Sequence, residues 1–308
     1  MSVSKPRRPI RHGWFTAALI AVACIGFGAP PASAEPVAGC VPAAASTVLS
    51  PGVPLLDWSE NVAYDAAGNL WVSRIYRNEV QRYDGSGRLT ATVPVEFPGA
   101  VRLGPDGLLY VVYGASPTSA IRPGGVVRFD PAAATPRPEV FVSGFTFPNG
   151  AAFDTDGVLY VASTATGVIK VRRDGTVDAE WTARAPGAGA NGIEVRDGIV
   201  YLTSNAGPLG RVMSFPVDAP ERRTVLADLS SSLPGVPDFA DDLLVDPDGI
   251  VYVATLSGKL VRIDPRGGAA CTVLSTEPMT SVVAVPGKPG ELLAGTERGG
   301  VLHIRLVP

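Results

Sequence analysis

Six turn glycines recur along this chain at intervals of 39, 50, 41, 51 and 41 residues. They are Gly68, Gly107, Gly157, Gly198, Gly249 and Gly290. Three residues after each glycine comes an apolar side chain, which is aromatic in five of the six copies. Repeats of roughly 40–50 residues that are built from short strands are typical of a β-propeller. The spacing therefore predicts six blades.

The first five repeats each carry the signals of four strands, the sixth carries the signals of three, and there are few signals of a helix. Val, Ile and Tyr alternate between Gly, Pro and Asp residues, and no segment keeps the apolar spacing of an amphipathic helix. The sixth repeat ends at Pro308 without a fourth strand, and Ser46 to Ser50 is expected to supply it. We therefore predict an all-β fold, a six-bladed β-propeller whose N-terminal strand closes the last blade.

The first 34 residues differ from the rest. Four basic residues precede an apolar run from Trp14 to Phe27, and Ala32-Ser33-Ala34 offers a cleavage site between small residues. This pattern predicts a secretory signal peptide over residues 1–34 and the propeller over residues 35–308. We expect export to the extracellular space or to a periplasm-like space of the cell envelope. The general and the twin-arginine routes both stay open.

Charge and cysteine content limit the partners. The chain has 26 basic and 29 acidic residues, and cleavage after Ala34 leaves 22 basic residues and a net charge near −7. This balance argues against nucleic acid and, once the signal is removed, against a membrane as partner. Cys40 and Cys271 remain in the mature chain, and in an oxidising compartment we expect them to form a disulfide. We expect a monomer or a weak dimer.

The start of each inner strand is expected to lie at one mouth of the central channel. The six positions at this offset from the turn glycines are Glu60, Gly99, Asn149, Asn191, Asp241 and Ser281. Four of them carry oxygen ligands, two as carboxylates and two as amides. Hard oxygen donors suit one divalent ion, calcium first, with magnesium, manganese or zinc as alternatives. Asn-Gly pairs are also ordinary turn chemistry, so a purely structural role stays open.

Other motifs are expected to be structural. The Asp-x-Asp-Gly copies that begin at Asp154 and Asp246 lack the later ligands of a calcium-binding EF-hand loop, so we interpret them as hairpin turns. His303 is the one histidine of the mature chain, which disfavours a Ser-His-Asp triad or a Cys/His zinc site. No glycine-rich phosphate loop is present, which disfavours nucleotide binding.

The loops after the second strands should share a face with the ring. They carry hydroxyls, amides and a few arginines, which around a metal would suit a polyhydroxylated compound or a lactone as the small-molecule substrate. The residues that we expect to contact this substrate are Arg74, Tyr113, Phe147 and Ser281.

Over essentially the whole mature chain, this pattern resembles the family of gluconolactonase, regucalcin (senescence marker protein) and luciferin-regenerating enzyme. The specific part is the order Glu60, Asn149, Asn191, Asp241, which is similar to the Glu, Asn, Asn, Asp set that surrounds a divalent metal in that family. Asn191-Gly192-Ile193 and the segment from Ala240 to Ala254 support the resemblance. It implies a metal-dependent lactonase or esterase. Glu60, Asn149 and Asn191 would hold the metal, and Asp241 would be both ligand and general base.

The chain departs from the family pattern at three places. The family has Arg two residues before the first metal Asn, where this chain has Phe147. The family's Glu-Gly-Pro is Glu60-Asn61-Val62 here, and its Pro-Asp-Gly is Ala240-Asp241-Asp242. These differences leave the four ligands in place and point to a less acidic or more apolar substrate than a sugar-acid lactone.

Two other classes of function remain open. One is a secreted binding or scaffold propeller in which the ring fixes a structural ion. The other is a relative of strictosidine synthase, which shares the architecture without this metal set. Fold alone does not choose between them.

Overall fold

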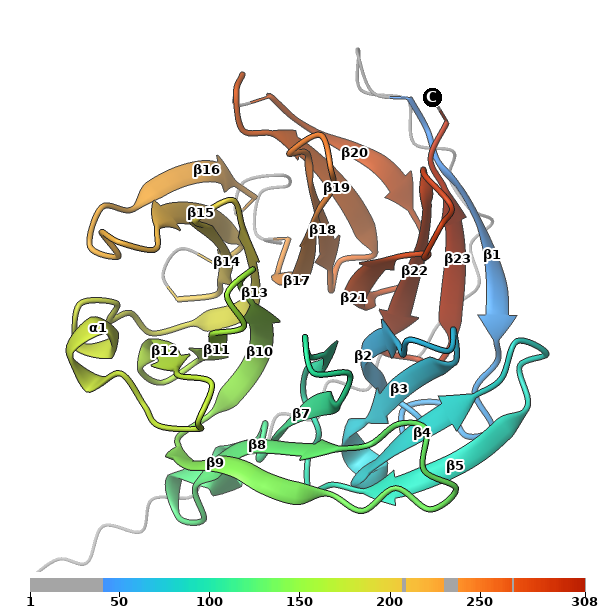
Figure 1. Cartoon of the computed structure of the whole chain (residues 1–308). Helices are drawn as coiled ribbons and strands as arrows, with labels where there is room; N and C mark the ends of the chain where they lie inside the picture. Colours follow the sequence, from blue (N-terminus) through green and yellow to red (C-terminus); the bar gives the residue numbers. More distant parts are fainter. Residues whose placement is uncertain (1–40, 207–208, 230–237, 268, 308) are drawn as a thin grey trace, which may run out of the picture. The chain divides into compact units, whose positions relative to one another are not determined.

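The computed structural model describes residues 41–206, 209–229, 238–267 and 269–307, which belong to one compact unit, Pro36–Pro308. Within this unit, six antiparallel sheets form a ring around a central channel (Figure 1). The predicted six-bladed β-propeller is confirmed. The predicted signal peptide, residues 1–34, lies outside the described residues.

The two inner strands of every blade have the same arrangement. The innermost strands are β2 (Ser59–Tyr64), β6 (Val101–Leu103), β10 (Pro148–Phe153), β13 (Ala190–Arg196), β17 (Ala240–Val245) and β21 (Met279–Ala284). The second strands are β3 (Leu70–Arg74), β7 (Leu109–Tyr113), β11 (Leu159–Ser163), β14 (Ile199–Ser204), β18 (Val251–Thr255) and β22 (Glu291–Thr296). Each second strand ends beside the start of its inner strand, as in the pair Ser59 and Arg74. The loops after the second strands therefore share a face with the inner-strand starts.

The outer strands are less uniform. The third strands are β4 (Glu79–Tyr83), β8 (Gly124–Phe129), β12 (Gly167–Val171), β15 (Arg211–Pro216), β19 (Lys259–Asp264) and β23 (Val301–Arg305). The fourth strands of blades 1, 2, 4 and 5 are β5 (Leu89–Pro94), β9 (Glu139–Phe145), β16 (Thr224–Asp228) and β20 (Ala269–Ser275). Two short 3-10 helices, η1 (Ile75–Arg77) and η2 (Pro117–Ala120), follow β3 and β7.

The fourth strand that the sequence predicts for blade 3 is wrong. The sheet of this blade has three strands among the described residues, and helix α1 (Ala179–Ala183) follows the third. Asp178 caps this helix by accepting a hydrogen bond from the backbone N–H of Trp181 at 3.2 Å. The Trp181 ring is buried against Tyr160, with the ring centroids 5.3 Å apart. A capped turn that buries one large aromatic ring thus takes the place of the outer strand.

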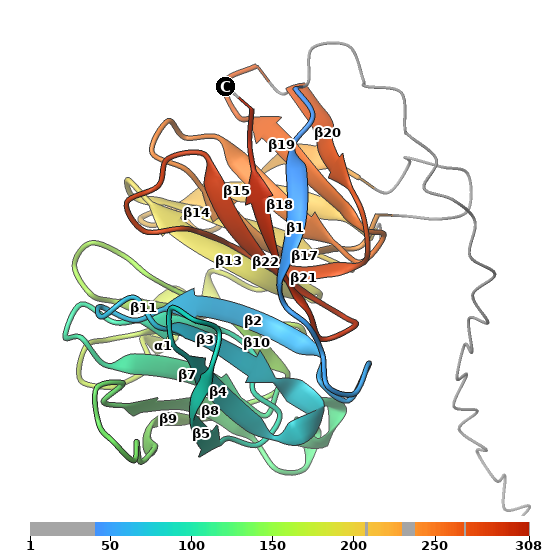
Figure 2. The ribbon, with the colours of Figure 1, turned by 90° about the vertical axis from the view of Figure 1, so that its right-hand side faces the viewer.

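The N-terminal strand closes the ring as predicted. Strand β1 (Ala44–Leu49) pairs antiparallel with β23 and supplies the fourth strand of blade 6. Figures 1 and 2 both show β1 along the outer edge of that blade. Both ends of the propeller sequence are thereby joined in one sheet, which leaves β23 without an open edge.

The hydrophobic core is divided among the interfaces between neighbouring blades. Each of six buried clusters contains residues of two adjacent blades. The cluster between blades 1 and 2, for example, packs Trp71 and Val80 against Leu109 and Phe129. Because every blade contributes to two interfaces, burial of these faces fixes the blades around the channel.

The Asp-x-Asp-Gly motifs are hairpin turns, as predicted. Oδ1 of Asp154 accepts hydrogen bonds from the backbone N–H groups of Asp156 and Val158, both at 2.9 Å. Gly157 has φ +76°, a conformation that favours glycine. The carboxylate of Asp154 is therefore used to close the turn between β10 and β11.

The predicted disulfide involves a residue outside the described part of the chain, Cys40, so it stays a prediction. Cys271 lies on β20, beside Arg262 of β19. The backbone N–H of Ala43 donates to the carbonyl of Val273 at 2.7 Å, which joins the first described residues to the strand that carries Cys271. Within the described ranges, no helix is long and apolar enough to span a bilayer.

Candidate metal centre

The predicted ring residues lie near the starts of the inner strands of four blades: Glu60 on β2, Asn149 on β10, Asn191 on β13 and Asp241 on β17. Glycines allow these strands to approach closely. A Cβ atom on Gly150 would lie 2.3 Å from the carbonyl oxygen of Asn191, and one on Gly192 would lie 2.5 Å from that of Asp241. The Asn-Gly pairs are therefore more than turn chemistry, since they set the spacing of the ring.

Buried hydroxyl groups fix the backbone of the ring. Oγ of Ser73 donates to the carbonyl of Gly99 at 2.7 Å, from the second strand of blade 1 to the ring position of blade 2. Thr203, on the second strand of blade 4, donates in the same way to the carbonyl of Asp241. Each bond joins one blade to the ring residue of the next, so the ring positions are held by rigid strands.

The four polar side chains converge in two pairs. Nδ2 of Asn149 donates to Oε1 of Glu60 at 3.3 Å, although the two residues belong to blades 3 and 1. Nδ2 of Asn191 donates to Oδ1 of Asp241 at 2.8 Å. The first pair reaches past blade 2, where Gly99 has no side chain. These bonds bring the four side chains together in two pairs, and their role as metal ligands stays a prediction.

Both carboxylates are buried in an environment that disfavours their charge. Glu60 and Asp241 are 9% and 6% exposed. Burial raises the pKa of Glu60 to about 7, against the opposing effect of hydrogen bonds from Trp58 and Asn149. Burial, followed by the charges of Glu60 and Asp242, raises the pKa of Asp241 well above its usual range. A cation between the two carboxylates would relieve both effects.

Two further ring oxygens are buried and have no hydrogen-bond partner in the described part of the chain. They are Oδ1 of Asn191 and Oγ of Ser281. An unpartnered buried acceptor is costly unless something binds it. Because the donor set is hard oxygen throughout, the residues fit a divalent cation. Among the described residues, no group of three or more His, Cys, Asp or Glu side chains is placed to hold a metal. The ring instead combines two carboxylates with two amides.

The other predicted substrate contacts have different surroundings. The side chains of Tyr113 and Phe147 are partly exposed. Ser281 is buried at the start of β21. Phe147 has φ +48°, and its backbone N–H donates a hydrogen bond to Oγ of Ser119 in η2. A left-handed aromatic residue is strained and is often found at functional sites. The contacts of all three with a substrate stay predictions.

Arg74 is engaged elsewhere. It is 2% exposed, and its guanidinium donates to the carbonyls of Asp57 and Gly299 and to Oγ of Ser59, each at 2.6 Å. These bonds tie blade 1 to the loop of blade 6. Its predicted contact with the substrate stays a prediction, and its observed bonds are structural.

Phe147 belongs to a set of aromatic residues near the mouth, and its other three members were not predicted from the sequence. Trp58, Phe97, Phe147 and Phe239 each stand two residues before a ring position, and all four are at least partly exposed. Nε1 of Trp58 donates to Oε2 of Glu60 at 2.7 Å, and its ring meets that of Tyr76 edge to face at 5.6 Å. The offset from the turn glycines, which located the ring, would also have located this set.

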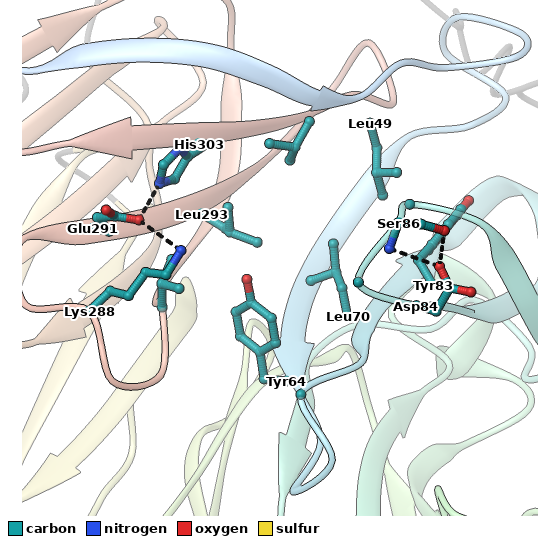
Figure 3. A pocket seen from close by; sticks show the side chains of 15 residues that line it. Leu49, Tyr64, Leu70, Tyr83, Asp84, Ser86, Lys288, Glu291, Leu293 and His303 are labelled. Carbon is teal, nitrogen blue, oxygen red and sulfur yellow. Dashed lines mark hydrogen bonds and ion pairs between the residues drawn. The ribbon is translucent and has the colours of Figure 1, made fainter.

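His303 lies on the third strand of blade 6, β23, and its structural role stays a prediction. It lines a cavity of about 390 Å³ between blades 1 and 6, beside the turn after Tyr83 (Figure 3). Its Nε2 lies 2.8 Å from Oε2 of Glu291, which also faces Lys288 at 3.6 Å. Tyr64 lines the same cavity and ends strand β2, whereas Glu60 is near its start.

Comparison with solved structures agrees with this architecture. A gluconolactonase from Xanthomonas campestris has a TM-score of 0.63 at 16% identity, over 89% of this chain and 99% of that one. A luciferin-regenerating enzyme has a TM-score of 0.67 at 16% identity, over 85% and 95%. Virginiamycin B lyase from Staphylococcus aureus has a TM-score of 0.59 at 9% identity, over 86% and 100%. No protein-family model matches the chain, and no curated protein matches it.

These similarities define a fold class. The chain has the fold of the gluconolactonase-like β-propellers, and the family suggested by the sequence is among its structural neighbours. The same architecture also occurs in a lyase, so it does not select the reaction. The chemistry must be argued from the ring.

Proposed function

We propose that the mature chain is an exported, divalent-metal-dependent hydrolase that opens a lactone or a related ester. The observation that carries the proposal is the convergence of Glu60, Asn149, Asn191 and Asp241 at one end of the channel. Two buried carboxylates and a buried amide oxygen without a hydrogen-bond partner lower the stability of the fold unless a ligand binds them. Oxygen donors of this kind favour calcium, with magnesium, manganese and zinc as alternatives.

In this proposal, each ring residue has a distinct task. Glu60, Asn149, Asn191 and Asp241 hold the cation. When bound, a divalent cation supplies positive charge that stabilises the oxyanion forming on the substrate carbonyl. Trp58 orients Glu60 through its hydrogen bond to Oε2.

Asp241 is also the proposed general base. Its Oδ1 accepts a hydrogen bond from Asn191, which leaves Oδ2 to take a proton from the attacking water. The water oxygen forms a bond to the carbonyl carbon, and the ring C–O bond of the lactone breaks. The proton held on Asp241 then passes to the departing alkoxide, which restores the carboxylate.

The aromatic residues before the ring indicate the class of substrate. Trp58, Tyr76 and Phe239 offer exposed apolar surface beside a polar ring. Such surface suits a lactone or ester with an alkyl or aryl group better than a polyhydroxylated sugar lactone. Phe147, in its left-handed conformation, occupies the same position relative to Asn149.

Calorimetric titration of the chelator-treated protein with calcium, manganese and zinc tests the metal centre. About one ion should bind per chain, and both Glu60→Ala and Asp241→Ala should abolish binding. Asp197→Asn is the matched control for acidic residues, because Asp197 is 90% exposed on a turn after β13. Failure of the wild-type protein to bind any of the three metals would overturn the proposal.

Hydrolysis assays with the metal-loaded protein test the chemistry. Dihydrocoumarin, an alkyl γ-lactone and glucono-δ-lactone cover the aryl, alkyl and sugar classes, and we expect turnover of the first two. Asp241→Asn should lower turnover by roughly 10²–10⁴-fold while metal still binds. A protein that binds metal but turns over none of the three would favour a binding propeller with a structural ion.

A further inference from the structure

A second polar layer crosses the channel directly behind the ring. Nδ2 of Asn61 donates to Oδ2 of Asp242 at 2.8 Å. Arg102 donates to the same oxygen at 3.0 Å, and to Oδ1 of Asn61 at 2.5 Å. The three side chains thus form a closed triangle of hydrogen bonds. Asn61 and Asp242 immediately follow the ring residues Glu60 and Asp241 in the sequence.

This triangle joins blades that are not neighbours. Asn61, Arg102 and Asp242 belong to β2, β6 and β17, the inner strands of blades 1, 2 and 5. Strands β2 and β17 each pack against β21, which stands between them. The bonds must therefore span the channel itself. On its far side, Arg102 and Glu194 face a cavity of about 250 Å³.

The layer is buried and charged. Asn61 and Asp242 are 4% exposed, and the side chain of Arg102 is 18% exposed. Electrostatic interactions are strong in such surroundings because little water screens them. Asp242 directly follows the ring residue Asp241 on β17. The carboxylate of Asp242 is therefore within electrostatic reach of the ring, and the positive charge of Arg102 offsets it.

We propose that the Arg102–Asp242 ion pair, held in place by Asn61, sets the affinity of the ring for its divalent cation. The inference rests on the proposed metal centre and adds residues that do not touch the metal. Arg102 lowers the negative potential at the ring, and Asp242 raises it.

The two halves of the pair should act in opposite directions. Asp242→Asn leaves the positive charge of Arg102 behind the ring, so metal affinity should fall by about tenfold or more. Arg102→Met leaves the negative charge of Asp242, so affinity should rise by a similar factor. In the double variant both charges are absent, and affinity should return to within about threefold of the wild type.

Calorimetric titration with calcium and manganese measures these affinities, with circular dichroism to verify folding. A purely structural pair would lower affinity in both single variants, with no recovery in the double variant. Arg128→Met is the matched control, because Arg128 pairs with Glu139 on the outer strands of blade 2 at 2.8 Å. Its metal affinity should not change.

The outcomes separate this inference from the proposed function. If the wild type binds metal through Glu60 and Asp241 but both single variants weaken binding, the metal centre stands and the tuning role is refuted. If the wild type binds no metal, both are refuted. If Arg102→Met does not fold, recovery in the double variant relative to Asp242→Asn still decides the question, and its absence overturns the inference.

Discussion

Replacing Glu60 by Gln should stabilise the metal-free protein and remove its response to metal. Glu60 is 9% exposed at the channel mouth, and burial raises its pKa from 4.5 to about 7. The folded protein therefore binds the Glu60 proton more tightly than the unfolded chain does. Gln keeps the shape of the protonated acid and has no charge to bury.

The size and the sign of the effect follow from linkage. The rise in the pKa of Glu60 from 4.5 to about 7 corresponds to roughly 3 kcal/mol in the free energy of unfolding. This value is an upper bound because Asp241 lies in the same site and interacts with Glu60. The stability that comes from protonated Glu60 is fully present below about pH 4.5 and is lost as the pH rises through about 7. The advantage of Glu60→Gln should therefore be small at pH 5 and largest above pH 8.

Urea unfolding in the presence of a chelator, followed by circular dichroism between pH 5 and 8.5, measures this advantage. Glu139→Gln is the control, since Glu139 forms an exposed ion pair with Arg128, and it should change stability by less than about 0.5 kcal/mol. With calcium at about 100 times its Kd, the wild type should gain roughly 2.7 kcal/mol and Glu60→Gln should gain nothing. An advantage that does not grow with pH would refute the reasoning.

Two further substitutions test how the ring is built. Trp58→Phe removes the hydrogen bond to Glu60 and keeps most of the aromatic surface, so calorimetry should show calcium affinity reduced by about two- to tenfold, and unchanged affinity would deny Trp58 an orienting role. Gly192→Ala places a Cβ 2.5 Å from the carbonyl oxygen of Asp241 and should cost about 2 kcal/mol or more in urea unfolding, whereas Gly85→Ala, with open space around it, should be nearly neutral. Equal stability of the two glycine variants would show that the inner strands can separate without cost.

The fold could be predicted because its signals are local and repeated. Each turn glycine, such as Gly157 with φ +76°, marks a hairpin whose two strands alternate in polarity. Six copies of one local pattern leave few alternatives to a propeller. The ring was found for the same reason, since Asn149 and Asn191 stand at nearly one offset from their glycines. The helix that replaces the fourth strand of blade 3 could not be predicted from the repeat. Helix α1 depends on the cap at Asp178 and on the burial of Trp181, and neither feature recurs in the other blades.

The polar layer behind the ring could not be predicted in this way. Asn61 and Asp242 are 181 residues apart, and nothing in either local sequence indicates that they meet. Both positions nevertheless stand out in the sequence. Asn61 and Asp242 are places where the chain departs from the pattern of the family that it resembles, which has Gly at each. The structure gives these two departures a common physical reason, because their side chains bond each other and Arg102. Arg74 is a residue whose surroundings the sequence did not predict. It was expected to contact the substrate, and its guanidinium instead bonds the carbonyls of Asp57 and Gly299, which joins blades 1 and 6.

The division of the core among blade interfaces explains how the fold can stay stable although its polar ring residues are buried. Each interface is packed with apolar side chains, as where Trp71 meets Phe129 with ring centroids 5.2 Å apart. These clusters lie between the sheets, so they stabilise the ring of blades without filling the channel mouth. The inner-strand starts can therefore carry residues that oppose folding, such as Glu60 and Asp241, both of which burial makes hard to ionise. A functional site is expected to contain residues that lower the stability of an otherwise well-packed fold. The energetics of the ring thus support the same location for the site as the repeat pattern does, and they do so independently of any resemblance.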